Sequence, residues 1–239
     1  MDASSILQVI AAEWPKFRRN LPWREVREPW PALVTEILLI QTDAAKVSAA
    51  YSKIMKTIPS PADAVRLGEE ALAELLRPLG LYRQRARALL RAATHIVNEL
   101  GGVTPSDYEE LKKIPGVGEY AAAAVAVAIS GRGAPVLDLN IARVLSRAIY
   151  GKGPPKRYMY DRSLRRLSER VNWSRELLFA VLDFAAGICR AKDPRCHQCP
   201  ITGLCLYWQT RWPSPTGTSE QRSRAPAHQI GKAPKKMQA

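Results

Sequence analysis

The sequence predicts an all-α protein of about ten helices, a number that follows from the usual length of helices in globular domains. Residues that begin and end helices recur along the chain, apolar side chains repeat at spacings of three and four, and the alternating pattern of β-strands is scarce. With 239 residues, of which 46% are hydrophobic, the chain can form one large domain or two small ones.

Capping residues predict where individual helices begin and end. Ser60-Pro61 and Thr104-Pro105 each combine an N-cap residue with a proline at the first helical position. Gly101-Gly102 is expected to end a helix over residues 83–100, because glycine is the usual residue just after a helix. Gly151 is expected to end another helix for the same reason.

The segment LKKIPGVGEYAAAAVAVAISG, residues 111–131, predicts two helices joined by a tight turn. The first helix is expected to end at Ile114, and an alanine-rich helix follows the turn. Gly116 and Gly118 let the backbone come close to another backbone. The amides that start the second helix carry the positive end of its dipole, so we expect this turn to hold a DNA phosphate without reading the sequence.

All four cysteines fall within one window of 17 residues, with the spacing C-x6-C-x2-C-x5-C. Such a cluster is expected to bind a metal, either as a [4Fe-4S] cluster or as a structural zinc. Two disulfides are the alternative. The N-terminal sequence MDASSILQVI lacks the basic start and long apolar run of a signal peptide, so we expect a reducing compartment and favour the metal. The four residues are Cys189, Cys196, Cys199 and Cys205.

The formal net charge of +14 indicates a polyanionic partner, most often nucleic acid, although a solvated basic surface is the alternative. Residues 209–239 hold six lysines and arginines and one acid, a charge of +5, which leaves +9 on residues 1–208. Their composition predicts a disordered basic tail, which we interpret as a solvated terminus rather than a phosphate-binding arm. No apolar run approaches the ~18 residues of a membrane span, so we expect a soluble protein.

Asp138 lies in PVLDLNIARVLSR, residues 135–147, just before a predicted helix over residues 141–150. The hairpin, an aspartate twenty residues past Gly118 and the cysteine spacing occur in an order that closely resembles the helix-hairpin-helix DNA glycosylases with an iron-sulfur cluster. The resemblance extends from about Phe17 to Tyr207, which is most of the chain.

This resemblance implies two helical domains with DNA in the cleft between them. A six-helix barrel domain with the hairpin would span residues 22–130, and an iron-sulfur domain would combine residues 1–21 with 131–208. It also implies a [4Fe-4S] cluster rather than zinc, with all four cysteines as ligands and His197 as a bystander. The cluster would hold the loop between the first two cysteines against DNA, where Arg190, Lys192 and Arg195 suit phosphate contacts.

A glycosylase flips its target base out of the duplex and breaks the bond between sugar and base through an oxocarbenium-like transition state. By resemblance, Asp138 is the catalytic carboxylate, although an aspartate at this place is also an ordinary N-cap. Glu36 lies in WPALVTEILLIQT, residues 30–42, beside the apolar stripe of a helix. Burial would raise its pKa and suit a general acid; a glutamate at the edge of the stripe is the alternative.

Tyr120 occupies the position, two past Gly118, where bifunctional relatives such as endonuclease III carry a lysine nucleophile. Tyrosine cannot form a Schiff base, so the resemblance implies a monofunctional glycosylase that leaves an abasic site; an aromatic core residue is the alternative. Gln41 and Leu81 match the residues that fill the hole left by the flipped base and wedge the duplex open. Each is otherwise an ordinary polar or core residue.

A tyrosine at position 120 resembles the pattern of the thymine/uracil mismatch glycosylases that act opposite guanine. The additional C-terminal domain of adenine glycosylases is not expected here, and both points favour the removal of thymine or uracil. Gln41 instead resembles the adenine branch, so an adenine glycosylase acting on A·G or A·8-oxoguanine is the second hypothesis. A noncatalytic DNA-binding iron-sulfur protein is the third hypothesis. Asp138 and Glu36 argue against it, because binding alone needs neither carboxylate. We expect a monomer that acts on double-stranded DNA with a mismatched or damaged base and does not bind a membrane. We expect it in the cytoplasm of a prokaryote, associated with the nucleoid.

Overall fold

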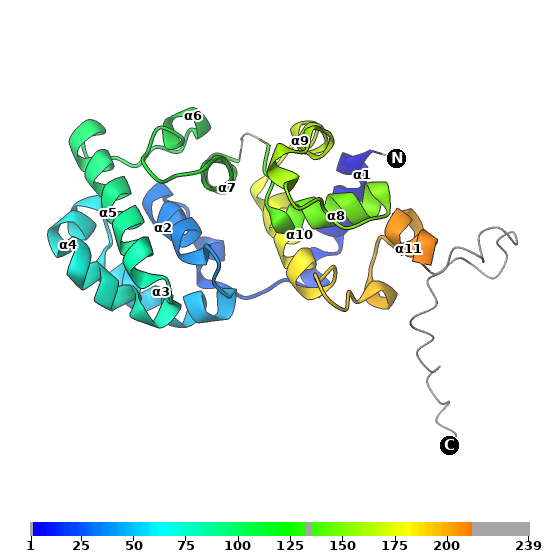
Figure 1. Ribbon diagram of the computed structural model, residues 1–239, viewed down its shortest axis with the longest axis horizontal. Helices are drawn as coiled ribbons and strands as arrows, with labels where there is room; N and C mark the ends of the chain where they lie inside the picture. Colours follow the sequence, from blue (N-terminus) through cyan, green and yellow to red (C-terminus); the bar gives the residue numbers. More distant parts are fainter. Residues whose placement is uncertain (1, 132–134, 212–239) are drawn as a thin grey trace, which may run out of the picture.

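The computed structural model describes residues 2–131 and 135–211. Across these ranges the chain forms eleven α-helices, six short 3-10 helices and no β-strand, which confirms the all-α prediction. Figure 1 shows α2 to α7 on one side of the molecule, and α1 with α8 to α11 on the other. The helices are α1 (Ala3–Ala12), α2 (Pro29–Leu39), α3 (Ala44–Thr57), α4 (Pro61–Leu76), α5 (Tyr82–Glu99), α6 (Tyr108–Leu111), α7 (Glu119–Ser130), α8 (Leu139–Tyr150), α9 (Arg162–Glu169), α10 (Arg175–Gly187) and α11 (Leu206–Arg211).

Two hydrophobic cores underlie this arrangement. In the first, α4 packs along α5 and α2 packs against α7, around fully buried side chains such as Leu33, Leu72 and Leu89. In the second, α1 packs against α10 through Ile6 and Ile10, which are also fully buried. The N-terminal helix therefore completes the core of the C-terminal half, and the chain crosses between the two sides twice.

Helix α7 contributes to both cores, which accounts for its alanine-rich sequence. Because small side chains cover its surface on two sides, helices from each core can approach its backbone closely. The predicted domain boundary at residue 130 coincides with the end of this shared helix. Its residues in the first core are Ala122, Val125 and Ala126, and those in the second are Ala123, Ala124 and Val127.

The start signal at Ser60 is confirmed, because its side chain accepts a hydrogen bond from the Asp63 amide at the start of α4. The prediction of a helix start at Thr104-Pro105 is wrong. Residues 103–106 are not helical, and α6 begins after Asp107. The Asp107 carboxylate accepts hydrogen bonds from two successive amides, at 2.8 and 3.1 Å, and this stronger cap sets the start of the helix.

The predicted start of the disordered tail at residue 209 is also wrong, because α11 continues to Arg211. The Gln209 amide donates to the Cys205 carbonyl at 3.1 Å, and the Arg211 guanidinium lies 4.2 Å from the Tyr207 ring centre. These contacts extend the helix through the first three residues of the predicted tail, and residues 212–239 lie outside the described part of the chain. No described helix is long and apolar enough to span a bilayer.

Candidate active site

A cavity of about 610 Å³ is lined by residues from both cores. This volume lies within the range of roughly 300–1,000 Å³ that is usual for ligand pockets. Four side chains predicted as functional line it together: Glu36 from α2, Gln41 from the following loop, Tyr120 from α7 and Asp138 from the start of α8. Segments far apart in the sequence therefore meet at one potential reaction site.

Asp138 is the N-cap of α8, and its carboxylate has two hydrogen-bond donors. One oxygen accepts from the Ile141 amide at 2.7 Å and the other from the Asn140 side-chain amide at 2.7 Å. Burial raises the pKa of Asp138, while these donors oppose the rise because they stabilise the charged form. The N-cap bonds thus fix the carboxylate in place while it faces the cavity, so the two roles considered for this residue are compatible.

Glu36 stands half-buried on the wall of the same cavity. Burial and the negative charge of Asp138 raise its pKa to about 8, against the opposing effect of Arg24. At neutral pH this carboxyl group therefore keeps its proton. The two carboxyl groups are suited to different tasks, because donors favour the anion of Asp138 whereas the charge of Asp138 favours the protonated form of Glu36.

Tyr120 lies in the first turn of α7 and lines the cavity beside both carboxyl groups. Burial, followed by the charges of Glu36 and Asp138, raises its pKa well above the ordinary value for tyrosine. Its phenol is therefore neutral, and it can donate a hydrogen bond. Tyr120 also packs against the second core, so its side chain combines the functional and the core role.

Arg24 is a cavity residue that the sequence patterns did not reveal. Its buried guanidinium donates to Asp183 at 2.5 Å and lies 4.0 Å from the centre of the Phe179 ring. The positive charge lowers the pKa of both Glu36 and Tyr120, so it limits how strongly these groups hold their protons. Its partners lie more than 150 positions away in the chain, and no local spacing could show the pairing.

Tyr158 is a second residue that sequence reasoning missed. It lies in the 3-10 helix Tyr158–Tyr160, between α8 and α9, and its side chain lines the cavity. Burial raises its pKa, and the charge of Asp138 adds to the effect. An aromatic ring at this place gives the cavity an apolar wall next to Asp138. No helical periodicity covers this segment, so the sequence offered no signal for it.

The two predicted wedge residues share an unusual backbone conformation. Gln41 has φ 50° and Leu81 has φ 48°, the left-handed region that non-glycine residues rarely adopt. Both side chains are exposed, Leu81 to 47%, although large apolar side chains are normally covered. Gln41 lines the cavity, and Leu81 lies outside its lining at the N-terminus of α5.

The predicted hairpin forms between α6 and α7. Gly116 has φ +88°, which explains a glycine there. Gly118 has φ −80° and precedes α7 without a side-chain cap, and a Cβ atom at this position would meet nothing within 4 Å. The protein itself thus does not require glycine at 118, and both Gly116 and Gly118 are exposed.

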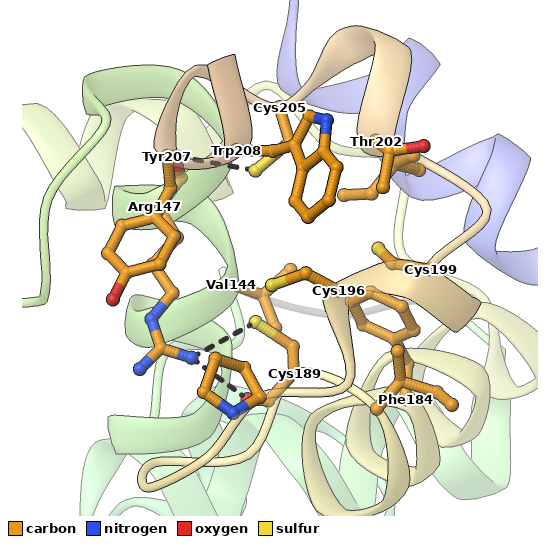
Figure 2. Close-up of a pocket in the computed structure, with 13 residues that line it drawn as sticks. Val144, Arg147, Phe184, Cys189, Cys196, Cys199, Thr202, Cys205, Tyr207 and Trp208 are labelled. Carbon is orange, nitrogen blue, oxygen red and sulfur yellow. Dashed lines mark hydrogen bonds between the residues drawn. The ribbon is translucent and has the colours of Figure 1, made fainter. Parts of the chain in front are cut away.

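The four cysteines surround a single pocket at the other end of α8, with apolar walls that include Val144 and Phe184 (Figure 2). All four are free cysteines in this structure. Arg147 donates to the Cys189 sulfur at 3.5 Å, and its backbone oxygen accepts from the Cys205 thiol at 3.7 Å. One arginine of α8 thereby touches the first and the last thiol.

The donor chemistry of this pocket fits a metal group bound by cysteine thiolates. Burial raises the pKa of Cys199 to about 12 and also raises the pKa of Cys196 and Cys205, so these thiols keep their protons unless a bound cation compensates the thiolate charge. Among the described residues, no three Cys, His, Asp or Glu side chains are grouped to hold a single metal ion. Four cysteines around a shared pocket are the donor set of an iron-sulfur cluster or a four-cysteine zinc site, so the residues present fit either group.

The three basic residues of the cysteine loop do not behave alike. Lys192 and Arg195 are exposed, as expected for phosphate contacts. Arg190 is half-buried, and its guanidinium donates to the Asp193 carbonyl at 2.6 and 3.1 Å. Arg190 therefore shapes the loop, while its two neighbours present charge to the surface.

A chain of hydrogen bonds on α8 connects the two sites. Arg143 donates to the Asn140 side-chain oxygen at 3.0 Å and to the Cys189 carbonyl at 2.9 Å. Because Asn140 also donates to Asp138, the carboxylate in the cavity is linked to the cysteine loop through two side chains. The sequence did not reveal this link, since it depends on how α8 packs against the end of α10.

Comparisons with known proteins agree with this arrangement. Residues 34–170 match the HhH-GPD superfamily base excision DNA repair protein family. The thymine-DNA glycosylase of Aeropyrum pernix is 36% identical over 195 residues, which cover 80% of this chain and 87% of the relative. An adenine DNA glycosylase of Mycobacterium tuberculosis is 33% identical over 214 residues, covering 87% of this chain and 69% of the relative.

The solved structure of a thermostable thymine-DNA glycosylase superposes with a TM-score of 0.77 and 30% sequence identity, covering 87% of this chain and 96% of that chain. The family match, the relatives and the shared architecture support one conclusion. This chain belongs to the HhH-GPD superfamily of base excision DNA repair proteins.

Proposed function

We propose that this chain is a monofunctional DNA glycosylase that hydrolyses the N-glycosidic bond of a thymine or uracil mispaired with guanine in double-stranded DNA. The meeting of Glu36, Tyr120 and Asp138 in one cavity carries the proposal. Family membership supports the reaction class, and the similarity to thymine-DNA glycosylases supports the base. The exposed hairpin glycines, the uncapped start of α7 and the net charge of +14 support DNA as the partner.

In the proposed reaction, the target base leaves the stack and enters the cavity. The Asp138 carboxylate stabilises the positive charge that develops on the sugar as the bond to the base breaks. Glu36, which keeps its proton up to about pH 8, donates a proton or a hydrogen bond to the departing base. Water then adds to the sugar and gives up one proton, which balances the proton taken by the base, and an abasic site remains.

The neutral phenol of Tyr120 is placed to hydrogen-bond within the cavity and cannot become a Schiff-base nucleophile. We therefore propose that the strand stays intact after excision. Borohydride tests this directly, because it traps a Schiff base between enzyme and sugar. A covalent complex on a mismatched duplex would contradict the monofunctional proposal.

We infer that the four cysteines hold a [4Fe-4S] cluster, which would anchor the loop that carries Lys192 and Arg195. The sulfur arrangement, the apolar walls and the contact from Arg147 support this inference. The protein's own contribution is to present these two basic side chains to DNA phosphates. Iron and sulfide analysis, with the brown absorption of a [4Fe-4S] protein, would test the cofactor independently of activity.

Removal of adenine is the second candidate function, because Gln41 resembles the adenine branch and an adenine DNA glycosylase is 33% identical. One experiment separates the two. Purified protein is incubated with duplexes carrying G·T, G·U, A·G or A·8-oxoguanine, and alkali and heat then reveal abasic sites. We expect cleavage at the G·T and G·U duplexes, whereas cleavage only at adenine would overturn the first candidate.

Binding without cleavage on any of these duplexes would instead support a noncatalytic DNA-binding protein. A matched control is needed, because loss of the iron-sulfur group would also abolish activity. The same preparation should therefore be shown to contain iron and to bind duplex DNA before a negative result is interpreted.

A further inference from the structure

Arg85 connects two loops that lie far apart in the sequence. It stands in the first turn of α5 and is only 3% exposed. On the α5 side, its guanidinium donates to the carbonyls of Leu79, at 3.1 Å, and Gly80. On the α2 side, it donates to the Ile40 carbonyl and the Thr42 hydroxyl. One planar group therefore holds both loops at once.

These two loops carry Gln41 and Leu81. Arg85 binds the residues on either side of Gln41 and the two residues just before Leu81. Both exposed residues are held in the left-handed conformation, at φ 50° and 48°. Such backbone strain persists only where the surroundings enforce it, and it gathers at functional positions. The contacts of Arg85 supply that enforcement on both loops.

Stability alone gives a poor reason for an arginine at this position. Burial lowers the pKa of Arg85, which shows that its charge is in an unfavourable environment. Its acceptors are neutral carbonyl and hydroxyl oxygens, and its Nε is buried without a partner. An apolar side chain that filled the same space would avoid this desolvation. A guanidinium offers something that an apolar chain cannot, namely several donors in a rigid fork.

We propose that Arg85 is a positioning residue that holds Gln41 and Leu81 at a fixed separation, so that both enter the duplex together and keep the target base extruded. This inference rests on the proposed function. It predicts that Arg85 acts on opening the duplex and not on breaking the bond to the base.

The test compares two substrates in single-turnover excision. In one duplex, uracil is paired with guanine. In the other, uracil lies opposite an abasic-site analogue, so no base pair has to be broken before uracil leaves the duplex. For Arg85→Met we expect a loss of about 10- to 100-fold on the paired duplex, the usual effect of misplacing groups by about 1 Å. On the unpaired uracil we expect rates within about twofold of the unaltered protein, because opening is no longer needed.

Two further variants protect the test against misfolding. Thr42→Val removes a single acceptor from the loop of Gln41 and should show a smaller loss with the same dependence on substrate. Arg66→Met is the matched control, because Arg66 is 76% exposed and only pairs with Asp63 on the surface. It should excise from both substrates like the unaltered protein. Circular dichroism melting of each variant reports the fold.

Equal losses on both substrates, or no loss on either, would overturn the proposal for Arg85. If the unaltered protein excises no base, the proposed function has failed, and a second measurement still tests Arg85. The fluorescence of 2-aminopurine next to the mismatch should rise when the unaltered protein binds and unstacks the duplex, and should stay low with Arg85→Met. An equal rise with both proteins would contradict the proposal.

Discussion

At the scale of residues, the site separates two carboxyl groups by their surroundings. Asp138 accepts hydrogen bonds from a backbone amide and a side-chain amide, which stabilise its charged form. Burial and the negative charge of Asp138 instead favour the protonated form of Glu36. Sequence motifs could identify Asp138, Glu36 and Tyr120, since each occupies a position fixed by spacing. They could not identify Arg24 or Tyr158, because those side chains reach the cavity only through long-range packing.

The pKa of Glu36 predicts how the reaction responds to pH. Because Glu36 assists the leaving base in its protonated form in the proposed reaction, the single-turnover rate should fall as pH rises through about 8. Glu36→Gln cannot transfer a proton, so its rate should be lower, by about 100-fold or more, and should lack this fall. Excision rates between pH 6 and 10 on a G·U duplex measure both effects. A fall at the same pH in Glu36→Gln would contradict the assignment.

The same group makes a separate prediction for stability. Its folded pKa lies above the usual value of 4.5, so the folded state holds a proton that the unfolded state releases. Stability from this group is therefore full below pH 4.5 and is lost as pH rises towards 8. At pH 9, the free energy of unfolding of Glu36→Gln should exceed that of the unaltered protein by about 2 kcal/mol, after allowance for water in the cavity. At pH 4, the two proteins should be equally stable. Denaturant unfolding at both pH values measures the difference.

At the scale of elements, the cysteine loop and the hairpin are the two structures proposed to present positive charge to DNA. Local sequence predicted both, because a turn between glycines and a C-x6-C-x2-C-x5-C spacing are short-range patterns. The sequence did not show that α7 serves two cores, since an alanine-rich helix has no single apolar stripe. The sequence signal at Thr104-Pro105 predicted the wrong start for α6, because Asp107, three residues further on, caps this helix.

The loop predicts a division of labour among its basic residues. Changing Lys192 and Arg195 together to alanine should weaken duplex binding about equally for all sequences. The slope of log Kd against log salt concentration should fall by about the amount expected for the loss of two phosphate contacts. The excision rate at saturating protein should change little. Arg190→Ala should act mainly by loosening the loop, seen as a lower melting temperature. Fluorescence anisotropy at several salt concentrations distinguishes these, and an unchanged salt slope would refute the phosphate contacts.

At the scale of the whole molecule, the two sides are joined by a buried ionic junction as well as by α7. Asp183 of α10 is completely buried and accepts hydrogen bonds from Trp14, Arg19 and Arg24. Burial alone would raise its pKa, but Arg24 and these donors outweigh that effect and lower it. The junction lies beside the cavity and fixes how the two cores meet there. Residues this far apart carry no local signal, so the sequence could not predict it.

Removing that charge should destabilise the whole fold. Asp183→Asn leaves the buried Arg24 without its counter-ion, and the expected loss is about 3–5 kcal/mol of unfolding free energy. Asp63→Asn is the matched control, because Asp63 pairs with an exposed arginine and its loss should cost far less. Urea unfolding at pH 7 measures both. Similar costs for the two variants would show that the junction does not hold the sides together.

The central claim is that Asp138 drives base excision in a cavity shared by both cores. It is tested most directly by single-turnover excision of uracil from a G·U duplex by the unaltered protein and by Asp138→Asn, with duplex affinity measured alongside. We expect the unaltered protein to produce alkali-labile abasic sites, and Asp138→Asn to bind the duplex equally well while its excision falls by at least about 1,000-fold. Excision by Asp138→Asn at a rate close to that of the unaltered protein would contradict this account.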